Sequence, residues 1–275
     1  MPDNTQSASR MTWEDAVAWL RSQPDQQDLV RACFYDDPAL AVAERYYTCA
    51  EWQALREFLP TRRGTALDLG AGRGIGAYAL ARDGWDVTAL EPDKSAIVGA
   101  QAIQKLASTA GLSIRVVEEW GESLPFEDGN FDFVYARQVL HHAKNLGELC
   151  KEVARVLRPG GLFIALREHV IDTKEDLPAF LASHPLHALY GGENAFLLEQ
   201  YLDAVRKSGL QVRTVLSPLE SDINLYPGTR AALLASWRNK LVIPLPAKLL
   251  SALVRWKSSR LTTPGRLYTF VCERL

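Results

Sequence analysis

The sequence of 275 residues has little cysteine and no long uninterrupted apolar run. Its four cysteines, Cys33, Cys49, Cys150 and Cys272, are dispersed and form no Cys-x-x-Cys pair, which excludes a zinc ribbon and a disulfide framework. The apolar stretch 241–254 has about 14 residues and contains two prolines and a lysine, so it is too short and broken to span a bilayer. Residues 1–10 are polar and lack the apolar core of a signal peptide. We therefore expect a reduced, cytoplasmic protein.

Acidic residues are missing from one long segment, between Asp222 and Glu273. The whole chain has 33 acidic and 31 basic residues and a net charge of −2. Eight of the basic residues lie in the segment without acids: Arg230, Arg238, Lys240, Lys248, Arg255, Lys257, Arg260 and Arg266. The rest of the chain therefore carries a net charge of −10, so an acidic body is joined to a basic C-terminal segment.

This basic segment has three interpretations. It is a solvated helical face, or it lies near an anionic acceptor, or it makes a peripheral membrane contact through residues 229–257, where apolar side chains alternate with the cations. Nucleic acid is the least favoured partner, because the body is acidic and no stacking platform or nucleic-acid-binding motif is visible. The oligomeric state is not indicated.

From Thr65 onward, apolar segments alternate with helical patterns, which is typical of a parallel sheet with crossover helices. We predict a single α/β domain with a Rossmann-like, mostly parallel seven-stranded sheet and helices on both faces. The predicted strands are 66–69, 87–90, 114–117, 131–135, 162–166, 212–216 and 267–272. The parts are a helical cap over 1–60, a cofactor-binding core over 61–170, a lid and helix over 171–210, a basic helical insert over 223–266 and the last strand over 267–275.

Within the cap, Thr12 is a predicted helix cap, and 38–59 is predicted as one long amphipathic helix. Within the basic insert, helices are predicted around 229–240 and 247–257. We expect the two strands that flank the insert to pair with each other, because the insert is then an addition to one domain.

The strongest motif is a glycine-rich turn after the first strand, Asp68-x-Gly70-x-Gly72-x-Gly74. Glycines let the backbone approach a ligand, and the following helix offers unpaired N–H groups, so a nucleotide-type cofactor fits there. Glu91 ends the next strand, at the spacing where α/β sheets hold ribose hydroxyls. The dinucleotide pattern Gly-x-Gly-x-x-Gly fits poorly, because Ile75 or Ala77 takes the place of its last glycine.

The same turn resembles the first motif of class I S-adenosylmethionine-dependent methyltransferases. Four further blocks resemble that family in order: Leu124-Pro125-Phe126, Asn130 to Val134, Val139 to His142, and Val156 to Gly161. They are similar to the small-molecule branch that includes the ubiquinone and menaquinone biosynthesis methyltransferases. The resemblance covers about Thr65 to Leu166.

The resemblance implies a cofactor site for S-adenosyl-L-methionine. Its methionine part would lie against Asp68 and the turn Gly70-Ala71-Gly72, with Gly74 also among the cofactor-binding residues, and Ala136 and Arg137 would border the methionine and sulfonium end. Glu91 would hold the ribose hydroxyls, while Pro92 and Gly121 would face the adenine. Trp120 departs from the family, which usually has an acid there, so Trp120 or Glu119 would take over at the adenine.

The acceptor side is predicted from histidines. All five lie between residues 141 and 187, and we predict that His141, His142 or His169 is the catalytic base, because imidazole titrates near neutral pH. Glu168 and His169 with a later histidine are metal-ligand types, but their spacing matches no metal motif, so no metal is predicted. Segment 186–194 is a candidate lid, and Arg45, Tyr46 and Tyr47 are candidates for the opposite wall.

Together these features predict an enzyme, a methyltransferase that acts on a small-molecule or lipid-linked, anionic acceptor, with oxygen favoured over nitrogen and carbon as the methylated atom. Two alternatives remain open at this point. One is a non-catalytic protein that has kept the fold, for which the departure at Trp120 is the only support. The other is an NAD-dependent oxidoreductase.

Overall fold

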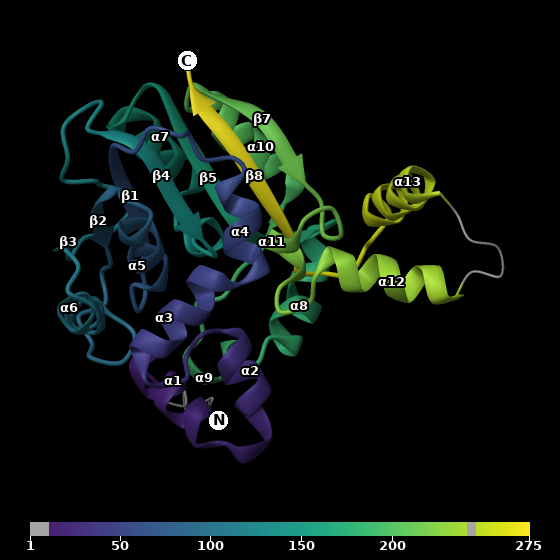
Figure 1. Ribbon diagram of the computed structural model, residues 1–275, viewed down its shortest axis with the longest axis horizontal. Coiled ribbons are helices and arrows are strands. Elements are labelled where there is room, and N and C mark those ends of the chain that lie inside the picture. Colours follow the sequence, from purple (N-terminus) through teal and green to yellow (C-terminus); the bar gives the residue numbers. More distant parts are fainter. Residues whose placement is uncertain (1–10, 241–245) are drawn as a thin grey trace, which may run out of the picture.

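The computed structural model describes residues 11–240 and 246–275. Its strands form one sheet in the order β3-β2-β1-β4-β5-β8-β7 (Figure 1). The bounds are β1 Thr65–Leu69, β2 Asp86–Leu90, β3 Ile114–Val117, β4 Phe131–Arg137, β5 Leu157–Ile171, β7 Leu210–Leu216 and β8 Arg266–Arg274. β1 to β5 are parallel, and β8 is antiparallel to both of its neighbours. The predicted mostly parallel sheet is confirmed, with a two-residue strand β6, Phe196–Leu197, added beside β5.

Helices connect the strands and cover both faces of the sheet. Their bounds are α1 Trp13–Ser22, α2 Gln27–Ala32, α3 Ala39–Thr48, α4 Ala50–Arg56, α5 Ile75–Arg82, α6 Ala100–Ala110, α7 Leu146–Val156, α8 Leu177–Ser183, α9 His187–Tyr190, α10 Leu198–Lys207, α11 Asp222–Leu225, α12 Arg230–Lys240 and α13 Ala247–Ser258. The core on one face is built from α7 and α10, and the core on the other from α3, α4, α5, α6 and α11. Thr12 caps α1 as predicted, because its Oγ1 accepts the N–H of Asp15 at 3.1 Å.

The single long helix predicted over 38–59 is wrong. The chain breaks at Cys49, whose backbone is extended with φ −73° and ψ 160°, and α3 and α4 lie on either side of it. Tyr46 and Trp52 are both fully buried, and their rings lie 5.5 Å apart. In one straight helix, residues six apart would be about 120° apart around the axis. The break therefore lets both aromatic rings enter the same core.

The strand order reverses between β1 and β4, where helices leave toward opposite faces. In open α/β sheets, ligands bind outside the carboxyl ends of the strands at such a point. Figure 1 shows α1, α2 and α9 together beyond this end of the sheet, and α1 contacts both α2 and α9. The N-terminal cap and the segment after β5 therefore meet over the place where the topology puts a ligand.

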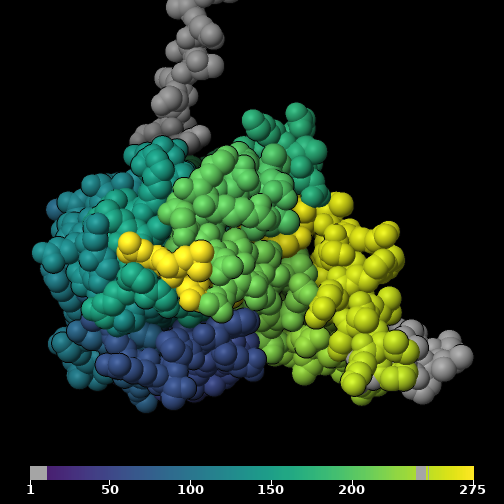
Figure 2. Space-filling view, turned by 90° about the horizontal axis from the view of Figure 1, so that it is seen from above, coloured from purple at the N-terminus to yellow at the C-terminus, as the bar shows by residue number. Residues whose placement is uncertain are grey.

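The basic insert forms α12 and α13, which stand out from the body beside the sheet (Figures 1 and 2). Its flanking strands β7 and β8 pair antiparallel, from Leu210 with Arg274 to Leu216 with Thr269, as predicted. Among the described helices, none is both long and apolar enough to cross a membrane. The polar residues 1–10 and the first five residues of the apolar run 241–254 lie outside the described part of the chain.

Candidate active site

A cavity of about 510 Å³ lies at the carboxyl ends of the central strands. This is within the range of small-molecule sites in proteins, about 300–1,000 Å³. Its walls come from the N-terminal cap, the glycine turn, the ends of β2, β4 and β5, and the segment after α8. Elements more than 100 residues apart in the sequence therefore build one site.

The glycine turn needs glycine at two positions for different reasons. Gly70 has φ +65°, and a Cβ there would lie 2.7 Å from the Val139 side chain. Gly74 precedes α5 with φ +81°, and a Cβ there would lie 3.0 Å from Ile103. Residues with a side chain rarely adopt a positive φ. The turn can thus pack against both α6 and the segment that follows β4 while its backbone borders the cavity.

Two carboxylates face the cavity from the ends of neighbouring strands. Glu91 accepts the Gly72 N–H at 2.7 Å and the Asp93 N–H at 3.0 Å, so it is fixed against the glycine turn. Asp68 is 2% exposed, and its Oδ2 has no hydrogen-bond partner among the described residues. Burial raises the pKa of Asp68 to about 8 and that of Glu91 to about 7. An unpaired buried carboxylate is costly, so the site is suited to a ligand that carries positive charge and hydroxyls.

Most of the predicted cofactor residues line the cavity. Asp68, Gly70, Ala71, Gly72, Glu91, Pro92, Trp120 and Arg137 do so. Three do not: Gly74 packs against Ile103, Gly121 packs against Leu149, and Ala136 is fully buried within β4. These three residues do not belong to the lining of the cavity, and their contact with the cofactor stays a prediction. Motif positions alternate between the two sides of a strand or turn, so only some can face a ligand.

Trp120 borders the cavity with 58% of its surface exposed, and the Lys144 ammonium lies 4.8 Å from its ring centroid. It is not part of the core. An exposed indole at a cavity rim can cover a flat ring, as predicted for the adenine.

Arg137 and Glu51 form a buried ion pair that the sequence did not reveal. Arg137 donates through Nε to Glu51 Oε1 at 2.6 Å and through Nη2 to Oε2 at 3.0 Å. Glu51 is fully buried, and the guanidinium of Arg167 lies 3.7 Å from it. The pair joins the end of β4 to α4, so it holds the N-terminal cap against the cavity.

The opposite wall is built from residues earlier in the chain than predicted. Trp13, Phe34 and Tyr35 line the cavity, whereas Arg45, Tyr46 and Tyr47 do not. Those three are used elsewhere: Arg45 pairs with Asp36, Tyr46 bonds to Tyr135, and Tyr47 bonds to Asp83. These bonds hold the three side chains away from the cavity.

The loop that supplies Phe34 is held by Arg73 of the glycine turn. Arg73 donates to the carbonyls of Phe34 at 3.0 Å and Asp36 at 2.8 Å and pairs with Asp37 at 2.6 Å. The cap is therefore bonded to the cofactor turn itself.

Four of the five histidines meet around one carboxylate, Glu193. His141, His142, His169 and His184 all line the cavity with it. His187 does not line the cavity. The three predicted catalytic histidines are thus brought together, and His184 joins them. The sequence offered no signal for Glu193 beyond its place in the 186–194 segment, since its partners lie as far as 52 residues away.

Three of these rings have a fixed orientation. Nδ1 of His141 lies 2.7 Å from Glu168 Oε2, Nδ1 of His142 lies 3.0 Å from the Gly192 carbonyl, and Nδ1 of His169 lies 2.8 Å from the Gly265 carbonyl. A carbonyl only accepts, and Glu168 already accepts three backbone N–H groups, so each Nδ1 carries the hydrogen. Each Nε2 is then left for the cavity side.

The charges of the cluster are unequal. Burial opposes protonation of His141, but its hydrogen bond to Glu168 and the negative charges of Glu168 and Glu193 outweigh burial and raise its pKa to about 9. Burial, with the charge of His141 beside it, lowers the pKa of His142 and lowers that of His169 to about 3. Burial by itself would raise the pKa of Glu193, but the histidines around it outweigh burial and lower that pKa well below its usual range.

The candidate lid over 186–194 lies directly on the site. Leu186, Tyr190, Gly192 and Glu193 line the cavity, and the Trp13 ring packs 4.5 Å from that of Tyr190. The short strand β6 follows this segment, and helix α10 begins directly after it at Leu198.

The cations of the basic insert do not line this cavity. The interpretation that they lie beside the acceptor is therefore not supported. Arg167 of β5 instead donates to the carbonyls of Ile223 at 2.8 Å and Tyr226 at 3.2 Å, which fixes the root of the insert to the sheet.

Comparisons with known proteins agree with the fold. A family model described as "Methyltransferase domain" matches residues 67–165. An uncharacterised methyltransferase of Mycobacterium sp. (strain JLS) is 39% identical over 129 residues, which cover 47% of this chain and 46% of that protein. The 27-O-demethylrifamycin SV methyltransferase of Amycolatopsis mediterranei (strain S699) is 33% identical over 151 residues, 54% of this chain and 53% of that protein. The chain thus spans about half the length of the curated relatives it matches.

The structure of a geranyl diphosphate methyltransferase, in complex with GPP and sinefungin, covers 95% of this chain and 98% of its own with a TM-score of 0.59. At 18% identity it shows the fold alone. The cavity of this chain lies at the switch point of that fold, and its glycine turn and Glu91 fall within the matched family segment. Residues 67–165 of this chain thus match a methyltransferase domain model, and the chain shares its fold with that geranyl diphosphate methyltransferase.

Proposed function

We propose that this protein transfers a methyl group from S-adenosylmethionine to an oxygen of a small-molecule or lipid-linked acceptor. The observation that carries the proposal is the single cavity that joins the two carboxylates of the cofactor side, Asp68 and Glu91, to the histidine cluster. Three histidine rings line this cavity with their Nδ1 atoms held by hydrogen bonds and their Nε2 atoms left available, which favours a catalytic role over a non-catalytic one. Methylation at oxygen is supported by the name of one relative, the 27-O-demethylrifamycin SV methyltransferase.

The residues present fit this cofactor. The unpartnered Oδ2 of Asp68 is a place for an ammonium group, and the carboxylate of Glu91 can accept hydrogen bonds from a ribose diol. When bound there, the cofactor supplies an electrophilic methyl group on its sulfonium sulfur. The protein then has to orient the acceptor, exclude water and take up the acceptor's proton.

His142 is the residue we assign to the proton. Its Nδ1–H is held by the Gly192 carbonyl, and its side chain is 39% exposed, which is more than that of His141, His169 or His184. His141 differs, because it is enclosed between two carboxylates. In this assignment the acceptor O–H gives its proton to Nε2 of His142 as the oxygen forms its bond to the methyl carbon, and the electrons of the old carbon–sulfur bond remain on sulfur.

The test separates binding from chemistry. We expect His142→Gln to lower kcat by about 100-fold or more, the usual contribution of a general base, and to leave the Kd for S-adenosylhomocysteine within about twofold. Single-turnover kinetics and calorimetry measure the two quantities. The control is His187→Gln, which changes a histidine outside the cavity. Full turnover by His142→Gln contradicts the assignment, and no binding of S-adenosylhomocysteine by the wild-type protein contradicts the proposed function.

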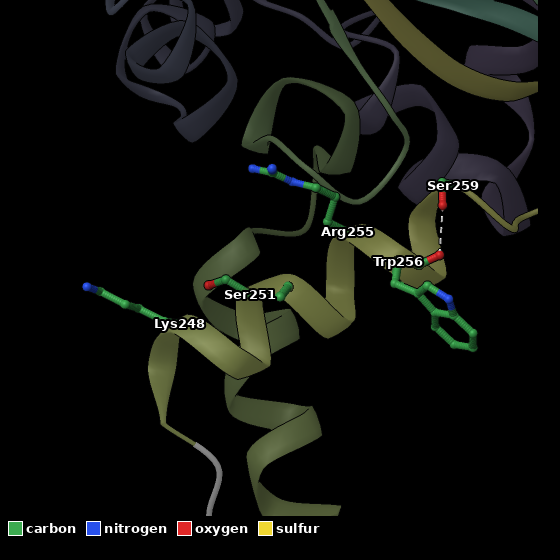
Figure 3. A pocket seen from close by; sticks show the side chains of 6 residues that line it. Lys248, Ser251, Arg255, Trp256 and Ser259 are labelled. Carbon is green, nitrogen blue, oxygen red and sulfur yellow. Dashed lines mark hydrogen bonds between the residues drawn. The ribbon is translucent and has the colours of Figure 1, made fainter.

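Helix α13 supports an acceptor held at a membrane surface. Leu250 and Val254 are 1% exposed, so one side of the helix is covered, while Leu249, Leu253 and Trp256 are 57%, 37% and 54% exposed on another side. Lys248 and Trp256 project from the same helix around a shallow groove that also includes Ser251 and Ser259 (Figure 3). An apolar stripe bordered by cations is suited to an anionic lipid surface. The motif resemblance to the ubiquinone and menaquinone enzymes favours the same kind of acceptor.

Vesicle binding checks this part of the proposal. We expect sedimentation with phosphatidylglycerol vesicles, and a decrease of at least about 10-fold in the partition constant for Leu249→Ser combined with Leu253→Ser, because two half-exposed leucines lose their insertion. Trp19→Ser is the control, since Trp19 is 41% exposed on α1, away from the insert. Equal binding to neutral phosphatidylcholine vesicles, or none to anionic ones, contradicts the membrane contact.

A further inference from the structure

We infer that His141, His169 and Glu193 form a binding site for one divalent transition-metal ion. Each of the three offers a ligand atom, and these atoms lie within 4.8 Å of one another. All three residues are buried and line the cavity. The inference goes beyond the proposed methyl transfer and does not depend on it.

The first argument is the support behind each ligand. His141 donates its Nδ1–H to Glu168, His169 donates its own to the Gly265 carbonyl, and Tyr190 donates its hydroxyl to Glu193 Oε1 at 2.5 Å. This leaves Nε2 of both rings and Oε2 of the carboxylate as the free atoms. Ligating histidines almost always give the other N–H to a carboxylate or carbonyl in this way, which fixes the ring and makes the ligand more basic.

The second argument is distance. Glu193 Oε2 lies 3.6 Å from Nε2 of His141, 3.8 Å from Nε2 of His184 and 3.9 Å from Nε2 of His142. These separations are too long for hydrogen bonds, which have a donor–acceptor distance of about 2.7–3.2 Å. Within the proposed ligand set, the His141–Glu193 separation of 3.6 Å is close to the separation of about 3.3–3.4 Å between two ligand atoms that bind a tetrahedral ion at about 2.0–2.1 Å. The ligand atom of His169 lies within 4.8 Å of the other two, so the three ligand atoms are close together, and those of His141 and Glu193 do not bond to each other.

The third argument is charge. Glu168 and Glu193 bring two carboxylates into a region where neither side chain is more than 5% exposed. With Nδ1-protonated, neutral imidazoles, the pair needs two positive charges to balance it, and a divalent ion supplies both at one point. A single imidazolium at His141 supplies only one.

Two imidazoles and one carboxylate favour a borderline ion over a hard one. Zn²⁺ and Fe²⁺ use this ligand set, whereas Mg²⁺ and Ca²⁺ prefer oxygen ligands. Three protein ligands also leave coordination positions open. If the proposed function holds, an open position toward the cavity is where the acceptor's oxygen would be held beside His142.

Metal binding is tested on the full chain after removal of bound ions with a chelator, and without cofactor or acceptor. We expect one Zn²⁺ per chain by calorimetry and a visible absorption band with Co²⁺ that Zn²⁺ displaces. Glu193→Gln or His169→Gln should weaken Zn²⁺ binding by more than about 100-fold, and the supporting change Glu168→Gln by about 10–100-fold. Tyr190→Phe removes the hydrogen bond that supports Glu193 and changes no buried charge, so it tests the support of the ligands even if Glu168→Gln does not fold.

His187→Gln is the matched control and should bind Zn²⁺ like the wild type. The inference is overturned if Zn²⁺ does not bind stoichiometrically, or if Glu193→Gln and His169→Gln, shown to be folded by circular dichroism, keep wild-type affinity. Calorimetry of the metal-free protein with S-adenosylhomocysteine is run in parallel. Its failure would count against the proposed function alone, and failure of Zn²⁺ binding would count against the metal site alone.

Discussion

Glu91→Ala is expected to weaken the binding of S-adenosylhomocysteine by about 100-fold or more. The carboxylate can accept two hydrogen bonds from a diol, and bonds to a charged group contribute about 1.5–3 kcal/mol each, so their loss is about 3 kcal/mol or more. The same change also frees the Gly72 N–H that Glu91 holds at 2.7 Å. Calorimetry measures the Kd.

The control is Glu118→Ala, which removes an acid that is 38% exposed and pairs with Lys94 at 3.2 Å outside the cavity. It should leave the Kd unchanged. An unchanged Kd for Glu91→Ala, in a protein with a wild-type circular dichroism spectrum, would mean that the ribose is held elsewhere.

The same experiment has a pH dependence with a definite sign. In the free protein, burial raises the pKa of Glu91 to about 7 and that of Asp68 to about 8, so both are largely protonated at pH 6. The ligand's hydroxyls and ammonium favour the ionised carboxylates. Affinity should therefore increase from pH 6 to pH 8, by at most about tenfold per pH unit for each proton released. Glu91→Ala should show a smaller increase than the wild type.

Glu51→Ala is expected to destabilise the fold by about 3–5 kcal/mol, because removing one partner of a buried ion pair leaves the other charge without compensation. Glu51 is 0% exposed and holds Arg137 through two hydrogen bonds. Arg167, 3.7 Å away, would also lose its nearest carboxylate partner among the described residues. The midpoint of thermal unfolding should decrease by about 10 °C.

A surface pair gives the comparison. Glu148 and Lys151 lie 2.7 Å apart, with side chains 50% and 58% exposed, and Glu148→Ala should cost less than about 1 kcal/mol. Urea unfolding followed by circular dichroism measures both variants. If Glu51→Ala is no less stable than Glu148→Ala, the pair does not hold the N-terminal cap to the sheet.

The sequence alone determined the sheet and the cofactor side of the site. The seven strands, the glycine turn and Glu91 were predicted close to where they lie, because each depends on neighbours within about 30 residues. A run of apolar residues between turn signals is a local property. The single helix predicted over 38–59 failed for the opposite reason, since its break at Cys49 serves the burial of Tyr46 and Trp52 against the distant residue Tyr135.

Only the tertiary structure decided the acceptor side. The sequence placed five histidines within one region but gave no reason to connect Glu193 with His141, 52 positions earlier, or Glu51 with Arg137, 86 positions later. Nor could it show that the cations of the insert avoid the cavity that Phe34 and Tyr35 line. The periodicity of a sequence indicates which face of a helix or strand is buried. Which side chains from distant segments contact one another depends on how the helices and strands pack together.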